Sequence, residues 1–114
     1  MKYTDSHEWI RVDEKEGLVG ISQHAQKELG EIVYIELPEI GKEVKAGEEI
    51  AVLESTKAAV DILSPVQGKV IEVNGALREN CDLLNHNPES LGWIFKLYID
   101  EPKDLETLFE KKKS

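Results

Sequence analysis

The stretch AVLESTKAAVDILSPVQGKV, residues 51–70, predicts two β-strands joined by a turn. Apolar runs at 50–53 and 60–63 flank the polar step STKA at 55–58, and short apolar runs between polar breaks are typical of strands. The step contains no Gly, Asn, Asp or Pro, the residues that usually form tight hairpin turns. It carries instead one long amine, Lys57, among short side chains. We therefore expect a hairpin whose tip holds Lys57 away from the core and open to solvent.

A short repeat punctuates the chain on both sides of this hairpin. PEIGK at 38–42 recurs as PVQGK at 65–69, and the two copies lie on opposite sides of Lys57. Each copy leads into a β-branched residue, Val44 or Val70. The repeat predicts two similar strand–turn–strand halves folded over each other, with Lys57 near the crossover.

The first third of the chain predicts a strand pair followed by a short helix. Strands are expected over 8–13 and 17–21, around the charged turn DEKEG. Ser22 is a favourable helix N-cap and Gly30 a favourable C-terminal stop. We therefore expect one or two helical turns between them.

A further strand is expected over 32–37, where the side chains alternate. Alternation places successive residues on opposite faces of a strand. One face would be largely apolar and the other mixed, and Pro38 would end the strand. The apolar face is expected to hold Val33, Ile35 and Leu37, and the mixed face Ile32, Tyr34 and Glu36.

The last third predicts a helical turn from Asn74, a long loop over 81–92 and a closing strand over 93–99. A C-terminal helix is expected over about 102–111, because Pro102 suits the first turn of a helix. Its apolar stripe would follow the spacing i, i+3, i+4, and the basic run after it would face the negative end of the helix dipole. These residues are Leu105, Leu108 and Phe109 for the stripe and Lys111, Lys112 and Lys113 for the basic run.

Length and composition favour one domain spanning residues 1–114. Many short strands with Gly and Pro turns favour a mainly β fold, a small sandwich or flattened barrel.

The net charge of −9, from 14 Lys and Arg against 23 Asp and Glu, argues against nucleic-acid binding and suits partners with basic docking surfaces. The single cysteine, Cys81, excludes an internal disulfide and is expected to be a small apolar filler. No apolar run approaches a membrane span and the N-terminus lacks a signal-peptide core, so we expect a cytoplasmic protein. We also expect it to be a monomer.

Few residues are arranged for chemistry. His7, His24 and His86 occur at no ligand spacing, and no common catalytic or nucleotide-binding motif is present, so we expect neither a metal site nor an enzyme. Lys57 remains. The residues around Lys57 alone are compatible with an ordinary surface lysine and with a modified or catalytic one. A rigid hairpin that presents one accessible amine is what covalent attachment of a swinging cofactor requires.

Ordered motifs covering roughly residues 3–109 resemble those of one known family. They are YTDSHEWI, VGISQHAQKELGEIVYIELPEIG, VKAGE, AVLESTKAAVDILSPVQGKVIEVN, LLNHNP and GWIFKL. The chain is similar in these motifs to the glycine cleavage system H proteins, which are lipoyl carriers. The resemblance implies a barrel-sandwich hybrid of two small antiparallel sheets with short helices.

The resemblance also implies the site residues. Lys57 matches the lysine that carries lipoate through an amide, and Glu54 and Gly68 match positions that help lipoylating enzymes recognise the hairpin. At Glu28 some relatives have a histidine that faces the cleft, and that contact does not carry over. The positions that match the lining of the cleft in which the loaded arm rests are Ser6, Glu8 and Asp61.

The implied function is that of a non-catalytic carrier. A glycine decarboxylase (P protein) would pass an aminomethyl group to the arm on Lys57. An aminomethyltransferase (T protein) would then take the group, and a dihydrolipoyl dehydrogenase (L protein) would reoxidise the arm. The cofactor carries the chemistry, and the cleft would shelter the labile group from water.

Three alternatives stay open at this point. A biotin carrier would place Met on both sides of the lysine, where this chain has Thr56 and Ala58, and the lipoyl domain of a 2-oxoacid dehydrogenase lacks the HEW motif. An H-like lipoate relay would donate lipoate to other proteins without the glycine enzymes. A noncovalent binding module, or an enzyme with a catalytic lysine, would leave Lys57 unmodified.

Overall fold

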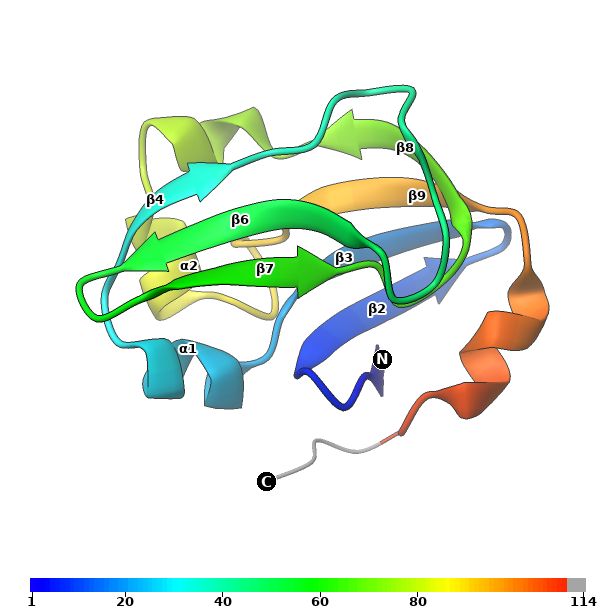
Figure 1. The fold of residues 1–114 in the computed structure, drawn as a ribbon, viewed down its shortest axis with the longest axis horizontal. Coiled ribbons are helices and arrows are strands. Elements are labelled where there is room, and N and C mark those ends of the chain that lie inside the picture. The colour runs from blue at the N-terminus through cyan, green and yellow to red at the C-terminus, as the bar shows by residue number, and fades with distance from the viewer. Residues whose placement is uncertain (111–114) are drawn as a thin grey trace.

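Two antiparallel sheets stack face to face in the computed structural model, which describes residues 1–110 (Figure 1). The six-stranded sheet has the order β1 (Lys2–Tyr3), β2 (Glu8–Asp13), β3 (Glu16–Ile21), β9 (Phe95–Ile99), β8 (Gly68–Val73) and β5 (Glu43–Val44). The three-stranded sheet has the order β4 (Ile32–Glu36), β6 (Glu49–Ser55) and β7 (Ala59–Leu63). The expected mainly β fold of two antiparallel sheets with short helices is thus confirmed.

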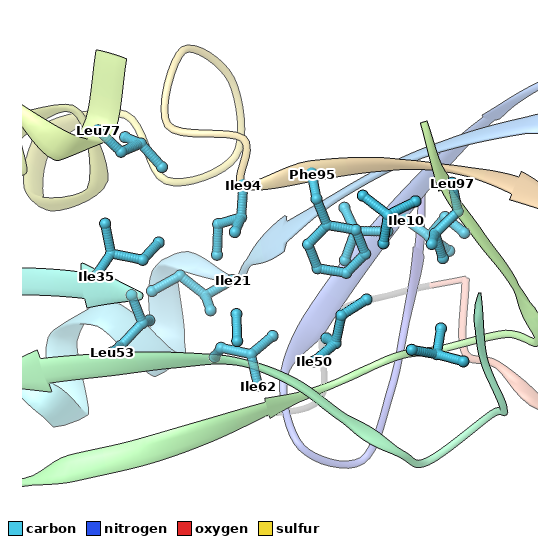
Figure 2. Packing of buried hydrophobic residues seen from close by; sticks show 14 of the residues in the cluster. Ile10, Ile21, Ile35, Ile50, Leu53, Ile62, Leu77, Ile94, Phe95 and Leu97 are labelled. Carbon is cyan, nitrogen blue, oxygen red and sulfur yellow. The ribbon is translucent and has the colours of Figure 1, made fainter. Parts of the chain in front are cut away.

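The core lies between the two sheets, and both contribute to it (Figure 2). Phe95 and Leu97 from β9 and Ile10 from β2 meet Leu53 and Ile62 from β6 and β7 across this space, and all are buried. Burial of large apolar side chains is the main stabilising contribution to folding. The β6–β7 hairpin is therefore anchored by one face of its strands.

Strand β4 corrects the expected alternation. Val33 is 52% exposed, whereas Ile32 and Ile35 are buried. The register against β6 shifts between Ile32 and Tyr34, and an extra residue at such a bulge interrupts the alternation of faces. The prediction that Val33 shares the inner face with Ile35 is wrong, because the bulge brings Ile32 to that face and turns Val33 outward.

The two copies of the repeat meet directly. The Gly41 N–H donates to the Val70 carbonyl at 2.7 Å, and the Val70 N–H donates to the Lys42 carbonyl at 2.9 Å. Strand β5 follows the first copy and strand β8 begins within the second, and the two strands pair antiparallel in the six-stranded sheet. Between the copies, the chain leaves this sheet to form the β6–β7 hairpin of the other sheet.

The first helix follows the prediction. Helix α1 covers Gln23–Leu29; the Ser22 side chain caps it by accepting from the Ala25 N–H at 3.1 Å, and Gly30 ends it. The helical turn expected from Asn74 is the 3₁₀-helix η1 (Gly75–Arg78). None of the helices in residues 1–110 is long and apolar enough to cross a membrane.

The region expected to be a loop contains helix α2 (Asp82–His86), so the prediction over 81–92 is wrong in part. Leu84 is buried in the core and Leu83 packs against it. The favourable burial of this leucine pair orders a segment whose Asn and Pro content suggested irregular structure.

The expected helix over 102–111 is also corrected. It is the 3₁₀-helix η2 (Pro102–Thr107), and its three-residue turn brings Leu105 and Leu108 to the same side, partly buried against the core. Phe109 leaves the stripe: its N–H donates to the Tyr3 carbonyl at 2.8 Å, in a bridge to β1. The basic run at 111–113 lies outside the described residues.

Candidate functional site

The β6–β7 turn is built by a serine side chain in place of the usual turn residues. The Ser55 N–H donates to the Ala58 carbonyl at 2.8 Å. The Ser55 Oγ accepts from the backbone N–H groups of Lys57 and Ala58, each at 3.1 Å. A hydroxyl that bonds the following backbone supports a turn at a non-glycine sequence. The turn therefore forms without a positive φ at any of its residues.

The tip of the hairpin is fixed to the rest of the molecule on one side. The Thr56 N–H donates to the Glu31 carbonyl at 3.0 Å, which joins the turn to the segment between α1 and β4. Thr56, Lys57 and Ala58 are all exposed. The structure thus holds the backbone at Lys57 in place and leaves its amine accessible, as expected from the sequence.

A cavity of about 260 Å³ lies between α1, the edge strand β7 and the segment that leads into β2. Ser6, Glu8 and Asp61, the residues predicted to line the cleft, all border this cavity. Its apolar wall includes Leu29 from α1 and Val60 from β7. The structure therefore brings together three residues that are separated by up to 55 positions in the sequence.

Glu8 is the buried carboxylate of the cavity, with only 2% of its surface exposed. Oε1 accepts from the Thr4 hydroxyl, and Oε2 accepts from the Leu63 N–H on β7 at 3.1 Å. Burial raises the pKa of Glu8, while the hydrogen bonds from Thr4 and Leu63 and the charge of His7 oppose that rise. This side chain also satisfies an N–H group on the outer edge of β7.

Asp61 lies at the rim of the cavity. It is exposed and pairs in register with Val52 of β6, which is itself paired with Glu36 of β4. Residues that lie directly opposite in a sheet share one face, so Asp61 belongs to the outer face of the three-stranded sheet. It also borders a larger groove of about 750 Å³ on that side.

The histidine pair at the cavity was not found from the sequence. The rings of His7 and His24 lie with their centroids 4.6 Å apart, and the His24 Nε2 is 2.9 Å from the Glu28 Oε1. His7 and Glu28 both border the cavity. Residues 7 and 24 show no common periodicity, because a loop and a whole strand pair separate them. Glu28 thus adds a carboxylate at the border of the cavity.

The two positions implied in lipoylation differ in their surroundings. Glu54 is exposed on β6, just before the turn, and pairs with Ala59. Gly68 is buried at the start of β8, at the end of the molecule away from the β6–β7 turn (Figure 1). A Cβ at Gly68 would overlap the Tyr98 carbonyl oxygen on β9, so close strand packing by itself requires glycine here.

The fold and the site together define a class of protein. Two stacked antiparallel sheets present one exposed lysine on an anchored hairpin turn, beside a cavity with a buried carboxylate. The fold and the presented lysine are features of the carrier class of domains.

Comparison with known proteins gives the family. The glycine cleavage H-protein family matches residues 1–114. The glycine cleavage system H protein of Thermotoga maritima is 47% identical over 110 residues, which are 96% of this chain and 89% of that protein. The corresponding protein of Legionella pneumophila strain Corby is 49% identical over 108 residues, 95% of this chain and 86% of that protein.

A solved structure supports the same assignment. The crystal structure of a glycine cleavage system H protein from Mycobacterium marinum matches with a TM-score of 0.83 and 33% identity, over 87% of this chain and 83% of that one. The chain therefore belongs to the glycine cleavage H-protein family. Membership supports a lipoyl-carrier role in the glycine cleavage system, as a carrier subunit rather than a catalyst.

Proposed function

We propose that the chain carries lipoate on Lys57 and shuttles an aminomethyl group between the enzymes of glycine cleavage. The observation that carries this proposal is the anchored turn: Lys57 is exposed between small neighbours, and its backbone is held beside a cavity. A lipoyl group fits these residues. An accessible amine suits an amide bond, and a cavity with apolar walls and one buried carboxylate suits an alkyl arm that ends in a cation.

Lipoate, when bound, supplies a disulfide that opens to hold the aminomethyl group on one sulfur. The protein's own side chains tether the arm, orient it and shelter the group at its end. Lys57 sets the reach of the arm and keeps its end at high local concentration near each partner's active site. Leu29 and Val60 would exclude water from the resting arm.

Glu8 is the residue proposed to hold the protonated aminomethyl nitrogen. Its two hydrogen bonds, from Thr4 and from the Leu63 N–H, fix the carboxylate and leave each oxygen a further lone pair. Ser6 and Asp61 at the same cavity are proposed to support this contact from its rim.

The test of Glu8 is the hydrolytic lifetime of the loaded carrier. Glu8→Gln keeps the shape and removes the charge, and should shorten the lifetime about tenfold, the typical strength of a charge-assisted hydrogen bond. Because only the ionised carboxylate attracts the cation, protection in the wild type should fade as the pH falls through the raised pKa of Glu8. An unchanged lifetime in Glu8→Gln would exclude this role.

The proposed partners are a glycine decarboxylase, an aminomethyltransferase, a dihydrolipoyl dehydrogenase and lipoylating enzymes. The net charge of −9 favours fast, weak encounters with basic docking surfaces. Glu54 beside the turn is proposed as a recognition residue for lipoylation. Gly68 is proposed to act indirectly, by allowing β8 to pack against β9. We also propose that the chain works in the cytoplasm, the location that its bacterial relatives imply, and that it works there as a monomer.

The deciding experiment is intact mass after expression in a lipoate-replete host. One lipoyl-sized increment is expected, and its persistent absence would overturn the proposal. Reconstitution of glycine decarboxylation with the partner enzymes then tests the shuttle. If the lipoylated carrier transferred lipoate to another carrier protein but supported no glycine turnover, a lipoate relay would replace the shuttle as its function.

A further inference from the structure

The Lys57 side chain does not project freely from the turn but lies across Gly30. A Cβ built on Gly30 would lie 3.5 Å from Cε of Lys57, and 3.8 Å from both its Cδ and its Nζ. These are ordinary van der Waals distances, so the far half of the lysine occupies the space beside the glycine. A side chain longer than a methyl group at residue 30 would need that same space.

The backbone around Gly30 is held independently of the lysine. The Gly30 N–H donates to the Gln26 carbonyl at 2.9 Å, and the Gly30 carbonyl accepts from Gln26 Nε2 at 3.1 Å. The next residue, Glu31, accepts the Thr56 N–H. With φ of 82° and ψ of −150°, Gly30 adopts a conformation that is almost restricted to glycine. The backbones that carry the two residues are therefore both held by hydrogen bonds, and the lysine side chain makes the contact between them.

Gly30 also lies next to the lining of the cavity in sequence. It directly follows Leu29, which borders the cavity from α1, while Val60 borders it from β7 three residues after Lys57. Figure 1 shows α1 beside the β6–β7 turn, with the chain after α1 passing along that turn. A group attached to Nζ thus starts beside Gly30, which is one residue away from the cavity lining at Leu29.

We propose that Gly30 is a positioning residue for the arm on Lys57, because its missing side chain opens the passage from the turn into the cavity. The inference rests on the proposed lipoyl-carrier function. It assigns to Gly30 a role beyond ending helix α1: the passage directs the first carbons of the arm, so that its end reaches the buried carboxylate of Glu8.

A graded series of variants separates this role from backbone strain. The carrier is lipoylated and then loaded with an aminomethyl group by glycine decarboxylase acting on glycine. The measured quantity is the hydrolytic lifetime of this loaded carrier. Gly30→Ala introduces the backbone strain with only a methyl group that touches the lysine, and should change the lifetime less than about twofold. Gly30→Asn introduces the same strain and also occupies the passage, and should shorten the lifetime at least about fivefold. Gly47→Asn controls for asparagine at a positive φ elsewhere in the chain, since Gly47 has a φ of 83° and, apart from its chain neighbours, no atom within 4 Å of its Cβ position.

A second measurement does not depend on the folding of a variant. In the loaded wild-type carrier, a nuclear Overhauser effect is expected between the Gly30 Hα protons and the methylene protons of the arm next to the Lys57 amide. Absence of this effect, or a Gly30→Asn lifetime equal to that of Gly47→Asn, would overturn the proposal. Failure of the proposed function would look different: the wild type would not be lipoylated or would not load.

Discussion

Two hairpin turns of this molecule each present a lysine, and they differ in almost everything else. In the β2–β3 turn Asp13 pairs with Glu16, which leaves Glu14 and Lys15 at the tip, and Glu14 has a φ of 56°. In the β6–β7 turn a four-residue tip at 55–58 forms around the Ser55 hydroxyl with no positive φ. The turns lie at opposite ends of the molecule (Figure 1).

The surroundings of the two lysines explain why only one suits a carrier site. Lys15 stands between two glutamates, and its carbonyl accepts the Ile99 N–H at 2.7 Å. Lys57 stands between small uncharged residues, and its side chain lies over Gly30 beside a cavity. Exposure on a hairpin is common to both lysines, and Lys15 also borders an open groove of about 700 Å³. The distinguishing features are therefore the small uncharged neighbours of Lys57 and the buried carboxylate of Glu8 in the cavity near its turn.

The largest expected effect is on modification itself. Lys57→Ala should abolish the lipoyl mass increment completely, because no other lysine within residues 1–110 lies on the same anchored turn with the same clearance. Lys15→Ala is the matched control and should retain the full increment. A residual increment in Lys57→Ala, or its loss in Lys15→Ala, would break the comparison.

The next largest effect is expected on stability, at Gly68. Gly68→Ala would force a methyl group against the Tyr98 carbonyl and should lower the free energy of unfolding by at least about 3 kcal/mol, as measured by urea denaturation. Gly75→Ala should change it by less than about 0.5 kcal/mol, because only the end of the Arg78 side chain lies nearby. Lipoylation of Gly68→Ala should be normal when it is expressed per folded molecule. If it were lost, Gly68 would be a direct recognition residue, and the surface that lipoylating enzymes recognise would extend beyond the β6–β7 turn.

A charge placed next to Lys57 would make its turn resemble that of Lys15. Ala58→Glu should lower the lipoylation kcat/KM about tenfold, which corresponds to about 1.4 kcal/mol in the transition state, because it removes clearance around the amine. Stability should not change, since Ala58 is exposed. Ala46→Glu, in another exposed turn, should leave lipoylation unchanged; equal rates for the two variants would show that clearance does not matter.

The smallest expected effects concern how each turn is built. Ser55→Ala removes the oxygen that accepts two backbone N–H groups and should cost about 1 kcal/mol of stability. Glu14→Gly should instead stabilise the β2–β3 turn by about 0.5 kcal/mol, because glycine tolerates the positive φ. Thermal unfolding of the two variants measures both. Equal changes would mean that the turns do not differ in the way described.

Much of the fold could be predicted from short-range patterns. Strands β2 and β3, helix α1 with its Ser22 cap, and the β6–β7 hairpin lie where apolar runs, caps and turn residues placed them. Each of these patterns reports interactions within a few residues along the chain. The exposure of Lys57 followed from the same local reasoning.

The wrong predictions share a long-range cause. The faces of β4 were reversed at Val33 because pairing with β6 introduces a bulge. Helix α2 was missed because its order depends on the burial of Leu84 in a core that is built from distant strands. Phe109 left the expected helical stripe because its backbone pairs with that of Tyr3, at the other end of the chain.

The sequence by itself determined the strand pattern, the accessible lysine on its hairpin and, through ordered motifs, the family. Only the tertiary structure decided that Glu8 is buried, that His7 touches His24, and that the lysine side chain lies over Gly30. The physical reason is that periodicity records which way a side chain points from its own backbone. Which groups meet across a cavity depends instead on how separate elements pack, and that is fixed only when the whole core forms.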